Sequence, residues 1–310
     1  MHKDLFFDSH GAGRIHVCRW EPEGEPRAVL QIVHGIAEFA QRYEIFAEYL
    51  TELGFLVVAE DHMGHGQSIG DEPRGYFRGG WFAAVEDTYR LLLDTRKEFP
   101  GLPYVLFGHS MGSFMARTIL CKYPDSGISA AVICGTGWQP QLALPALIRV
   151  VEGVCRHRGE ENPDPQLHKM IFGGYNKQIK NPRTPNDWLT RDDAVVDAYN
   201  AHPLCGFVPA CGLLRDMMKG IFYIQQPENL KEMKKHLPVL FIAGKEDPVG
   251  NYGKGVEQAA AAFHKAGMVN VTARLYPACR HEILNELNSQ RVFDDIAAWL
   301  KRQLKGIQNA

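Results

Sequence analysis

The sequence of 310 residues has no long hydrophobic run, no surplus of positive charge and no internal repeat. The longest apolar candidate, residues 138–154, contains two prolines, an arginine and a glutamate, whereas a membrane-spanning helix needs about 20 mostly apolar residues. Met1-His2-Lys3-Asp4 is followed by no apolar stretch of the length that a secretory signal needs. Lys and Arg total 34 against 36 Asp and Glu, so no basic surplus points to nucleic acid. We therefore expect neither a transmembrane segment nor a nucleic-acid partner.

The cysteines form no C-x-x-C pair, which argues against a zinc ribbon or a thioredoxin-like motif. They number seven, and they are Cys18, Cys121, Cys134, Cys155, Cys205, Cys211 and Cys279. Several lie inside apolar runs, where a free cysteine behaves as a small buried hydrophobic residue. This usage predicts a reducing, cytoplasmic compartment.

The sequence does contain short, almost continuous apolar runs, which are typical of strands buried on both faces of a parallel sheet. These runs lie at residues 28–33, 55–59, 104–107, 130–134 and 239–243. Apolar residues at helical spacing predict helices around 43–53, 85–99 and 292–304. A strand at 14–20 behind a turn at 9–13 predicts an initial hairpin. The alternation predicts an α/β fold with a mainly parallel sheet and helices on both faces.

The alternation stops between residue 138 and residue 235. This stretch has helical fragments, several prolines and no convincing buried strand, and it is far longer than an ordinary connection of about 2–6 residues. We predict a mostly helical cap inserted into the fold. The predicted organisation is a core formed by 1–137 and 236–310, with the cap at 138–235.

The sharpest motif is Gly108-His109-Ser110-Met111-Gly112, a G-x-S-x-G sequence between an apolar strand and a stretch compatible with a helix. A nucleophilic serine needs a tight strand-to-helix turn, and the two glycines remove side chains that would collide in it. The helix N-terminus also presents unpaired N–H groups to any anion formed there. The bare motif occurs in ordinary glycine-rich turns, but the flanking strand and helix favour Ser110 as a nucleophile.

A candidate acid and a candidate base follow at the ends of two later strands, in the order serine, acid, histidine that is expected after such a strand-to-helix turn. The strand at 239–243 leads into Gly244-Lys245-Glu246-Asp247-Pro248, and the strand at 271–276 leads into the loop that carries His281. Asp247 is the predicted acid, because Pro248 disfavours helical geometry there. Glu246 is the rival, and it is better explained as a solvated charge. His281 is the predicted base.

The loop after residues 28–33 is predicted to complete an oxyanion hole. The N–H groups of Ile36 and Met111 would bind the anion, and Gly35 lets the backbone approach the substrate. His34 and His109 are interpreted as structural residues.

The H-x-x-H pair of His62 and His65 is the remaining candidate for a metal site. Gly64 and Gly66 argue against the helix that this spacing needs. We therefore predict no metal and no cofactor.

Several motifs together resemble the monoacylglycerol lipase and lysophospholipase group of α/β-hydrolases over nearly the whole chain. They are His34-Gly35-Ile36-Ala37-Glu38, Asp61-His62-Met63-Gly64-His65-Gly66-Gln67-Ser68, Gly108-His109-Ser110-Met111-Gly112, Gly244-Lys245-Glu246-Asp247-Pro248-Val249 and Arg280-His281-Glu282-Ile283-Leu284-Asn285-Glu286. Asp187-Trp188-Leu189-Thr190-Arg191-Asp192 and Pro203-Leu204-Cys205-Gly206-Phe207 resemble cap segments of the bacterial members. Met63, Ser113 and Ala278 depart from the pattern, and none of them removes a catalytic group.

The resemblance implies an α/β-hydrolase fold and the same triad of Ser110, Asp247 and His281. The expected chemistry is acyl transfer through a covalent serine ester, with a small-molecule ester or a lipid monoester as substrate. Phe207, Met217 and Met218 of the cap are candidates to line an acyl groove, although they could equally pack the cap onto the sheet. Transient contact of the cap with a membrane surface stays open, and the sequence predicts no oligomeric state.

Two other functions remain open from the sequence. The first is hydrolysis of small esters, thioesters or aminoacyl amides, for which an aminopeptidase would need cap carboxylates to hold a free amine. Glu160, Glu161, Asp192, Asp193 and Asp197 are the acids available there. The second is a non-catalytic binding protein, which the complete set of three triad residues disfavours.

Overall fold

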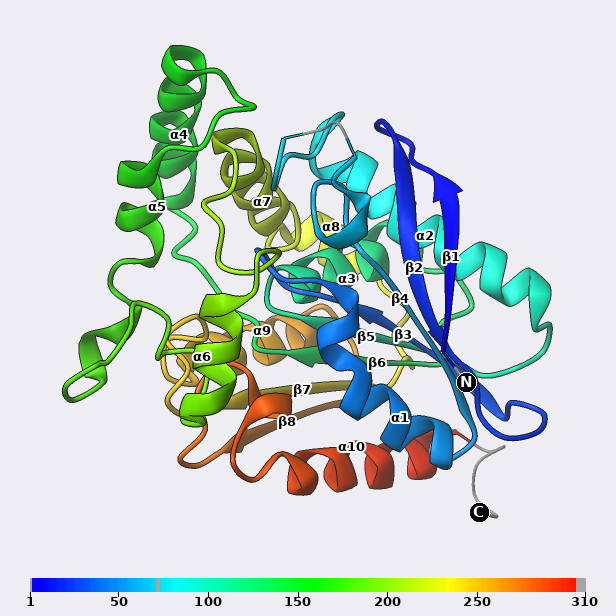
Figure 1. Cartoon of the computed structure of the whole chain (residues 1–310). Coiled ribbons are helices and arrows are strands. Elements are labelled where there is room, and N and C mark those ends of the chain that lie inside the picture. Colours follow the sequence, from blue (N-terminus) through cyan, green and yellow to red (C-terminus); the bar gives the residue numbers. More distant parts are fainter. Residues whose placement is uncertain (1, 71–72, 305–310) are drawn as a thin grey trace.

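A single sheet of eight strands organises the computed structural model, which describes residues 2–70 and 73–304. The strand order is β1-β2-β4-β3-β5-β6-β7-β8 (Figure 1). The strands are β1 (His2–Asp8), β2 (Arg14–Trp20), β3 (Ala28–Val33), β4 (Phe55–Glu60), β5 (Tyr104–His109), β6 (Ala130–Cys134), β7 (Val239–Gly244) and β8 (Val271–Tyr276). Pairs β1–β2 and β2–β4 are antiparallel, and all the others are parallel. The predicted mainly parallel α/β fold is confirmed.

The central strands are buried along their whole length. Every residue of β3, β4, β5, β6 and β7 is buried, as expected of parallel strands that are covered on both faces. The register pairs Ile32 with Phe107 and Phe107 with Val132, so the carboxyl ends of β3, β5 and β6 meet at one edge. In α/β sheets ligands bind at this edge.

Helices cover both faces of the sheet (Figure 1). On one face, α1 (Glu44–Glu52) and α10 (Ser289–Gln303) pack together, with the rings of Phe46 and Phe293 5.0 Å apart. On the other face lie α2 (Gly80–Glu98), α3 (Met111–Lys122) and α9 (Lys254–Lys265). Short 3-10 helices occur at Ala40–Tyr43, Gly66–Ser68, Tyr175–Gln178 and Ile283–Asn285.

Residues 138–235 connect β6 to β7 and are helical, as expected. They form α4 (Leu144–Arg158), α5 (Pro165–Phe172), α6 (Asp193–Ala201), α7 (Cys211–Tyr223) and α8 (Pro227–Glu232). The buried side of α7 joins the hydrophobic core formed by α2 and α3. The division into 1–137, 138–235 and 236–310 stays a prediction, and residues 1, 71–72 and 305–310 of these ranges lie outside the described residues.

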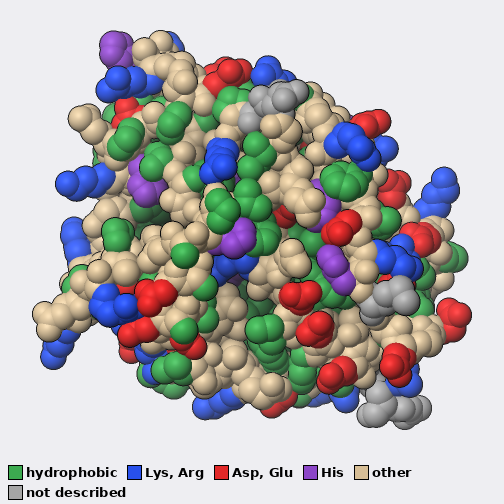
Figure 2. Space-filling model, viewed as in Figure 1, with side chains coloured by type: hydrophobic (Ala, Val, Ile, Leu, Met, Phe, Trp, Pro, Cys, Tyr) green, Lys and Arg blue, Asp and Glu red, His purple; other side chains and the backbone are tan. Residues whose placement is uncertain are grey.

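No helix within residues 2–70 and 73–304 combines the length and the apolar character needed to cross a bilayer. On the face shown in Figure 2, acidic and basic side chains are interspersed among apolar ones. This distribution agrees with the formal net charge of −2.

Candidate active site

Ser110 lies at the sharp turn between β5 and α3. Its backbone has φ 53° and ψ −120°, a left-handed geometry that is costly for a residue with a side chain. The turn is close-packed: a Cβ atom on Gly112 would lie 2.0 Å from the Val33 carbonyl oxygen, and one on Gly108 would lie 2.5 Å from the Gly112 oxygen. The main-chain N–H of Ser110 donates to the Cys134 oxygen at 3.0 Å. Steric crowding therefore explains why the motif has glycine at both positions, as predicted from the sequence.

His281 and Asp247 lie next to each other beyond the ends of β8 and β7. His281 is 2% exposed and Asp247 is fully buried. Nδ1 of His281 is 3.0 Å from Oδ1 of Asp247, but it is not well directed for a hydrogen bond, and Oδ2 of Asp247 has no hydrogen-bond partner among the described residues. Oδ1 accepts a bond from the N–H of Val249 at 2.8 Å. In active sites without substrate such contacts are often poorly aligned.

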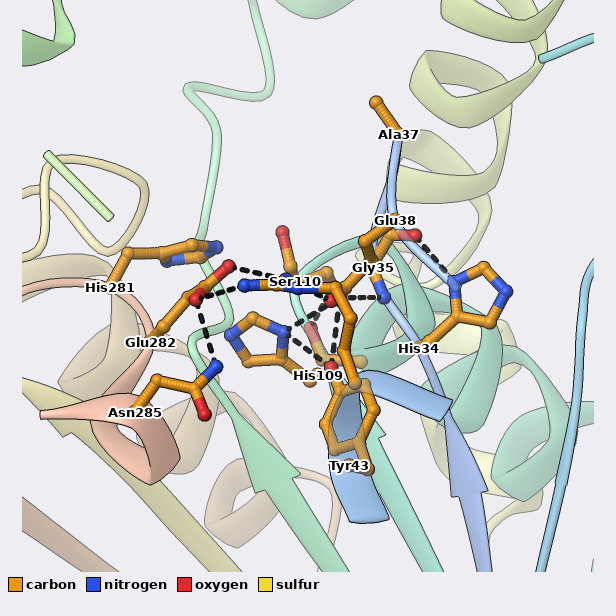
Figure 3. Close-up of polar contacts among 12 residues, drawn as sticks. His34, Gly35, Ala37, Glu38, Tyr43, His109, Ser110, His281, Glu282 and Asn285 are labelled. Atoms are coloured by element: carbon orange, nitrogen blue, oxygen red, sulfur yellow. Dashed lines mark hydrogen bonds and ion pairs between the residues drawn. The ribbon is translucent and has the colours of Figure 1, made fainter. Parts of the chain in front are cut away.

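Ser110 and His281 line one cavity of about 370 Å³ between the sheet edge and the helices of 138–235. Its walls also include the loop from Gly35 to Glu38. A Cβ atom on Gly35 would lie 3.1 Å from Cβ of Ser110, so that loop passes close beside the serine (Figure 3). The structure thus brings the predicted serine and histidine to one cavity, with Asp247 beside the histidine.

Of the two predicted oxyanion donors, one lines this cavity and the other directly follows the cavity residue Ser110. Ile36 is part of its wall. Met111 is the first residue of α3, where main-chain N–H groups have no acceptor within the helix. The N–H of Gly35 donates to Oε1 of Glu38 at 2.6 Å, which holds the loop in shape.

The cap candidates separate into two groups. Phe207 lines the cavity of Ser110. Met217 and Met218 instead line a neighbouring cavity of about 610 Å³ together with Phe114 and Trp138. Cavity residues that the sequence analysis missed are His168, Lys169, Phe172, Trp188, Leu189 and Tyr199.

A buried charge network in the wall of the cavity was also missed (Figure 3). Arg42 donates to Glu38 at 2.6 Å and to both oxygens of Glu282 at 2.8 Å each. Burial raises the pKa of Glu282, but the charge and hydrogen bonds of Arg42 outweigh it and hold this pKa below its usual value. The only signal in the sequence was the i, i+4 spacing of Glu38 and Arg42.

His109 belongs to the same network and has a structural place, as interpreted. Its Nδ1 lies 2.9 Å from the Tyr43 hydroxyl and 3.3 Å from Oε1 of Glu38. Burial disfavours its charged form, yet the hydrogen bond and charge of Glu38 raise its pKa. Burial acts to raise the pKa of Glu38, but the hydrogen bond with His109 holds this pKa well below its ordinary value.

The buried histidines His34, His62 and His65 form a cluster whose ring atoms contact main-chain groups. The rings of His34 and His62 are 3.9 Å apart. Nε2 of His34 accepts the N–H of His62 at 3.0 Å, and Nδ1 of His65 lies 3.1 Å from the Met63 oxygen. These contacts give the three rings a structural role behind the Gly35 loop.

We expect the protein to lose stability as the pH falls from 6.5 towards 4. Burial, followed by the neighbouring His62, lowers the pKa of His65 from 6.5 to about 4. Between these values the unfolded chain binds a proton that the folded protein does not, so the contribution is complete above pH 6.5 and lost on acidification. The shift corresponds to roughly 3 kcal/mol. Urea unfolding over this pH range should show a shallower loss for His65→Gln than for the exposed control His157→Gln; equal losses would contradict the assignment.

Comparisons with known proteins found a family model and relatives that match most of the chain. The family model described as "Serine aminopeptidase, S33" matches residues 24–288. A "Monoacylglycerol lipase" of Mycolicibacterium smegmatis is 29% identical over 96% of this chain and 96% of its own length. The "Monoglyceride lipase" of Homo sapiens is 27% identical, covering 97% of this chain and 92% of its own length.

Solved structures show the same fold. The thermostable carboxyl esterase of Bacillus coagulans superposes with a TM-score of 0.89 at 29% identity, covering 97% of this chain and 98% of that one. A monoglyceride lipase of Saccharomyces cerevisiae superposes with a TM-score of 0.76 at 18% identity, covering 98% of this chain and 96% of that one. The latter likeness supports the α/β-hydrolase fold alone.

Proposed function

Since the chain belongs to the serine aminopeptidase S33 family of α/β-hydrolases and is a monoacylglycerol lipase-like ester hydrolase, we propose that it cleaves lipid monoesters through a serine acyl-enzyme. The observation that carries the proposal is the shared cavity of Ser110 and His281, with Asp247 3.0 Å from the imidazole. A hydroxyl at a strained turn, a histidine and a buried carboxylate are the groups that nucleophilic catalysis by serine requires.

The proposed reaction starts with Ser110. His281 accepts the proton of the Ser110 hydroxyl as its oxygen attacks the ester carbonyl. Asp247 orients the imidazole and stabilises its protonated form. His281 then protonates the leaving alcohol, and the acyl group remains on Ser110. A water molecule activated by the same histidine releases the carboxylic acid.

The oxyanion of each tetrahedral intermediate would be bound by the N–H groups of Ile36 and Met111. Losing one such donor typically costs about 10²–10³ in rate. The bond from the Gly35 N–H to Glu38 supports this role, because it fixes the residue directly before Ile36. A fixed donor costs no reorganisation when the charge develops.

The cavity walls favour a substrate with an apolar acyl chain. Phe172, Trp188, Leu189, Phe207 and Pro209 supply aromatic and aliphatic surface on the side of the cap. Each methylene buried against such a surface contributes about 0.8 kcal/mol. The names of the M. smegmatis and human relatives agree with a monoacylglycerol as the ester.

The carboxylates argue against an aminopeptidase. Glu38 and Glu282 line the cavity but already pair with Arg42. Glu160 pairs with Arg215, and Asp193 and Asp197 pair with Arg183, so these cap acids already have cationic partners.

A substrate panel tests the proposal. We expect kcat/KM for medium-chain and long-chain monoacylglycerols to exceed that for aminoacyl amides by about 10²-fold or more, since an apolar acyl chain fits the walls and a charged amine does not. Within the esters, each added methylene that the cavity accommodates should raise kcat/KM by up to about fourfold. Lysophospholipids in the same panel test whether the protein prefers esters with a glycerol head group or esters with a phosphate head group. Faster cleavage of the amides would overturn the substrate assignment.

A further inference from the structure

The cap segment 187–191 lies along the loop that carries His281. The N–H of Glu282 donates to the Leu189 oxygen at 2.7 Å, and the N–H of His281 is 3.4 Å from the Trp188 oxygen. The Thr190 hydroxyl donates to the Asn285 oxygen at 2.9 Å. The two segments are about 90 residues apart in sequence, yet their main chains are joined at the histidine and at the residue after it.

The Arg280 side chain strengthens this pairing. Its Nη1 donates to the main-chain oxygen of Asp187 at 2.7 Å and to the main-chain oxygen of Thr190 at 2.9 Å. Asp187 in turn is buried and accepts from the N–H and hydroxyl groups of Thr184 and from the N–H of Arg183. The segment 187–191 is therefore itself held firmly within the cap.

Glu286 joins the two segments with one carboxylate. Its side chain is fully buried. Oε1 accepts from the N–H of Arg280 at 2.8 Å and from the N–H of Arg191 at 3.2 Å, and Oε2 accepts from Nε of Arg191 at 2.9 Å. Oε2 also accepts from the N–H of Leu287 at 3.2 Å. The carboxylate thus binds the residue directly before His281 and the end of the cap segment at once.

The segment also contacts the imidazole itself. The Trp188 ring lies 5.0 Å from the His281 ring at 42°, and the His109 ring lies 4.8 Å from it at 43°. Trp188 is supported by an edge contact with Tyr175 at 4.8 Å. The orientation of His281 therefore depends on the cap as well as on Asp247.

We propose that Glu286 is a positioning residue: it clamps the cap segment 187–191 onto the loop of His281 and so sets the place of the imidazole relative to Ser110. The inference rests on the proposed role of His281 as general base. A displacement of about 1 Å between reacting groups can cost about 10²-fold in rate. The cap accordingly contributes to turnover through the base as well as to substrate choice.

Glu286→Gln tests the clamp, because the amide keeps the size and one acceptor but turns an NH₂ donor towards the donors of Arg280 and Arg191. We expect kcat to fall by about 10- to 10²-fold with KM changed less than about threefold. The rate at which a fluorophosphonate labels Ser110 should fall by the same factor, since labelling depends on the base and not on the natural ester. Thr190→Val, which removes a single bond to the loop, should give a smaller loss of the same kind.

Asp87→Asn is the matched control. Asp87 is a buried carboxylate on α2 that holds another loop through Ser9 and His10, and it lies outside the cavity lining. This variant should lower the melting temperature and leave kcat and labelling unchanged.

The outcomes separate the two proposals. Unchanged kcat and labelling in a folded Glu286→Gln protein, or in Thr190→Val if the former does not fold, would overturn the clamp and leave the proposed function standing. An equal loss of kcat in Asp87→Asn would also overturn it. A wild-type protein that neither cleaves esters nor reacts with the fluorophosphonate would overturn the function and the clamp together.

Discussion

Ser110→Ala should lower kcat for monoacylglycerol hydrolysis by about 10⁴-fold or more and leave the protein folded. The loss is large because the proposed reaction forms its acyl-enzyme on the Ser110 hydroxyl, which alanine lacks. The fold should survive because the turn is held by main-chain bonds, from the Ser110 N–H to Cys134 and from the Ser113 N–H to the Ser110 oxygen. Alanine also bears the positive φ of 53° no worse than serine does. Turnover, fluorophosphonate adduct mass and melting temperature measure the three expectations.

Ser126→Ala is the control for this result. Ser126 is also buried, but it lies in the turn after α3, where its main chain binds Tyr123 and Arg96. It should retain wild-type kcat and labelling. Ester cleavage persisting in Ser110→Ala would place the nucleophile elsewhere and remove the basis of the mechanism.

Much of the fold could be predicted because its central strands are buried on both faces. The strands predicted at 28–33 and 130–134 have the observed bounds, and β5 extends two residues beyond 107 to reach His109. A strand with two buried faces must be apolar at nearly every position, so the sequence itself marks where it begins and ends. The first strand of the initial hairpin, β1, has a weaker hydrophobic pattern in the sequence because most of its residues are exposed.

The parts of the candidate site that depend on residues adjacent in the sequence were predictable. The parts formed by residues far apart in the sequence were not. Gly108 and Gly112 mark the serine turn because any larger side chain would clash there. Arg42 and Glu282, in contrast, are 240 positions apart, and nothing local tells that they pair. The catalytic roles of Ser110, Asp247 and His281 stay predictions.

The cap shows the same limit for apolar residues. Phe207, Met217 and Met218 all have the composition of a lipid-binding wall, yet only Phe207 lies at the cavity of Ser110. The methionines lie on α7, whose buried side packs into the core with α2 and α3. Hydrophobicity predicts that all three side chains are covered to some degree, but it does not identify the neighbours that cover them. For the two methionines, these neighbours depend on how α7 is rotated.

Asp247→Asn should reduce kcat by about 10⁴-fold, whereas Glu246→Gln should leave it within about twofold. Asp247 is fully buried 3.0 Å from Nδ1 of His281, while Glu246 is exposed. An amide at position 247 can offer its NH₂ to Nδ1 and so favour the tautomer that cannot accept the proton of Ser110. The steady-state kcat of both variants, measured side by side on one monoacylglycerol, distinguishes the two acids.

The neighbouring contacts give Asp247→Asn a stability cost as well. Nδ1 of His281 lies 3.0 Å from Oδ1 of Asp247, so an NH₂ that meets it takes the place of Oδ1, which accepts the N–H of Val249 at 2.8 Å. The N–H of Val249 then loses its acceptor, at a cost of about 1–3 kcal/mol of stability. Thermal unfolding must therefore accompany the kinetics, with activity read well below the melting temperature. If Glu246→Gln lost the rate and Asp247→Asn kept it, the acid would be Glu246, and the short distance between Asp247 and His281 would be a structural contact.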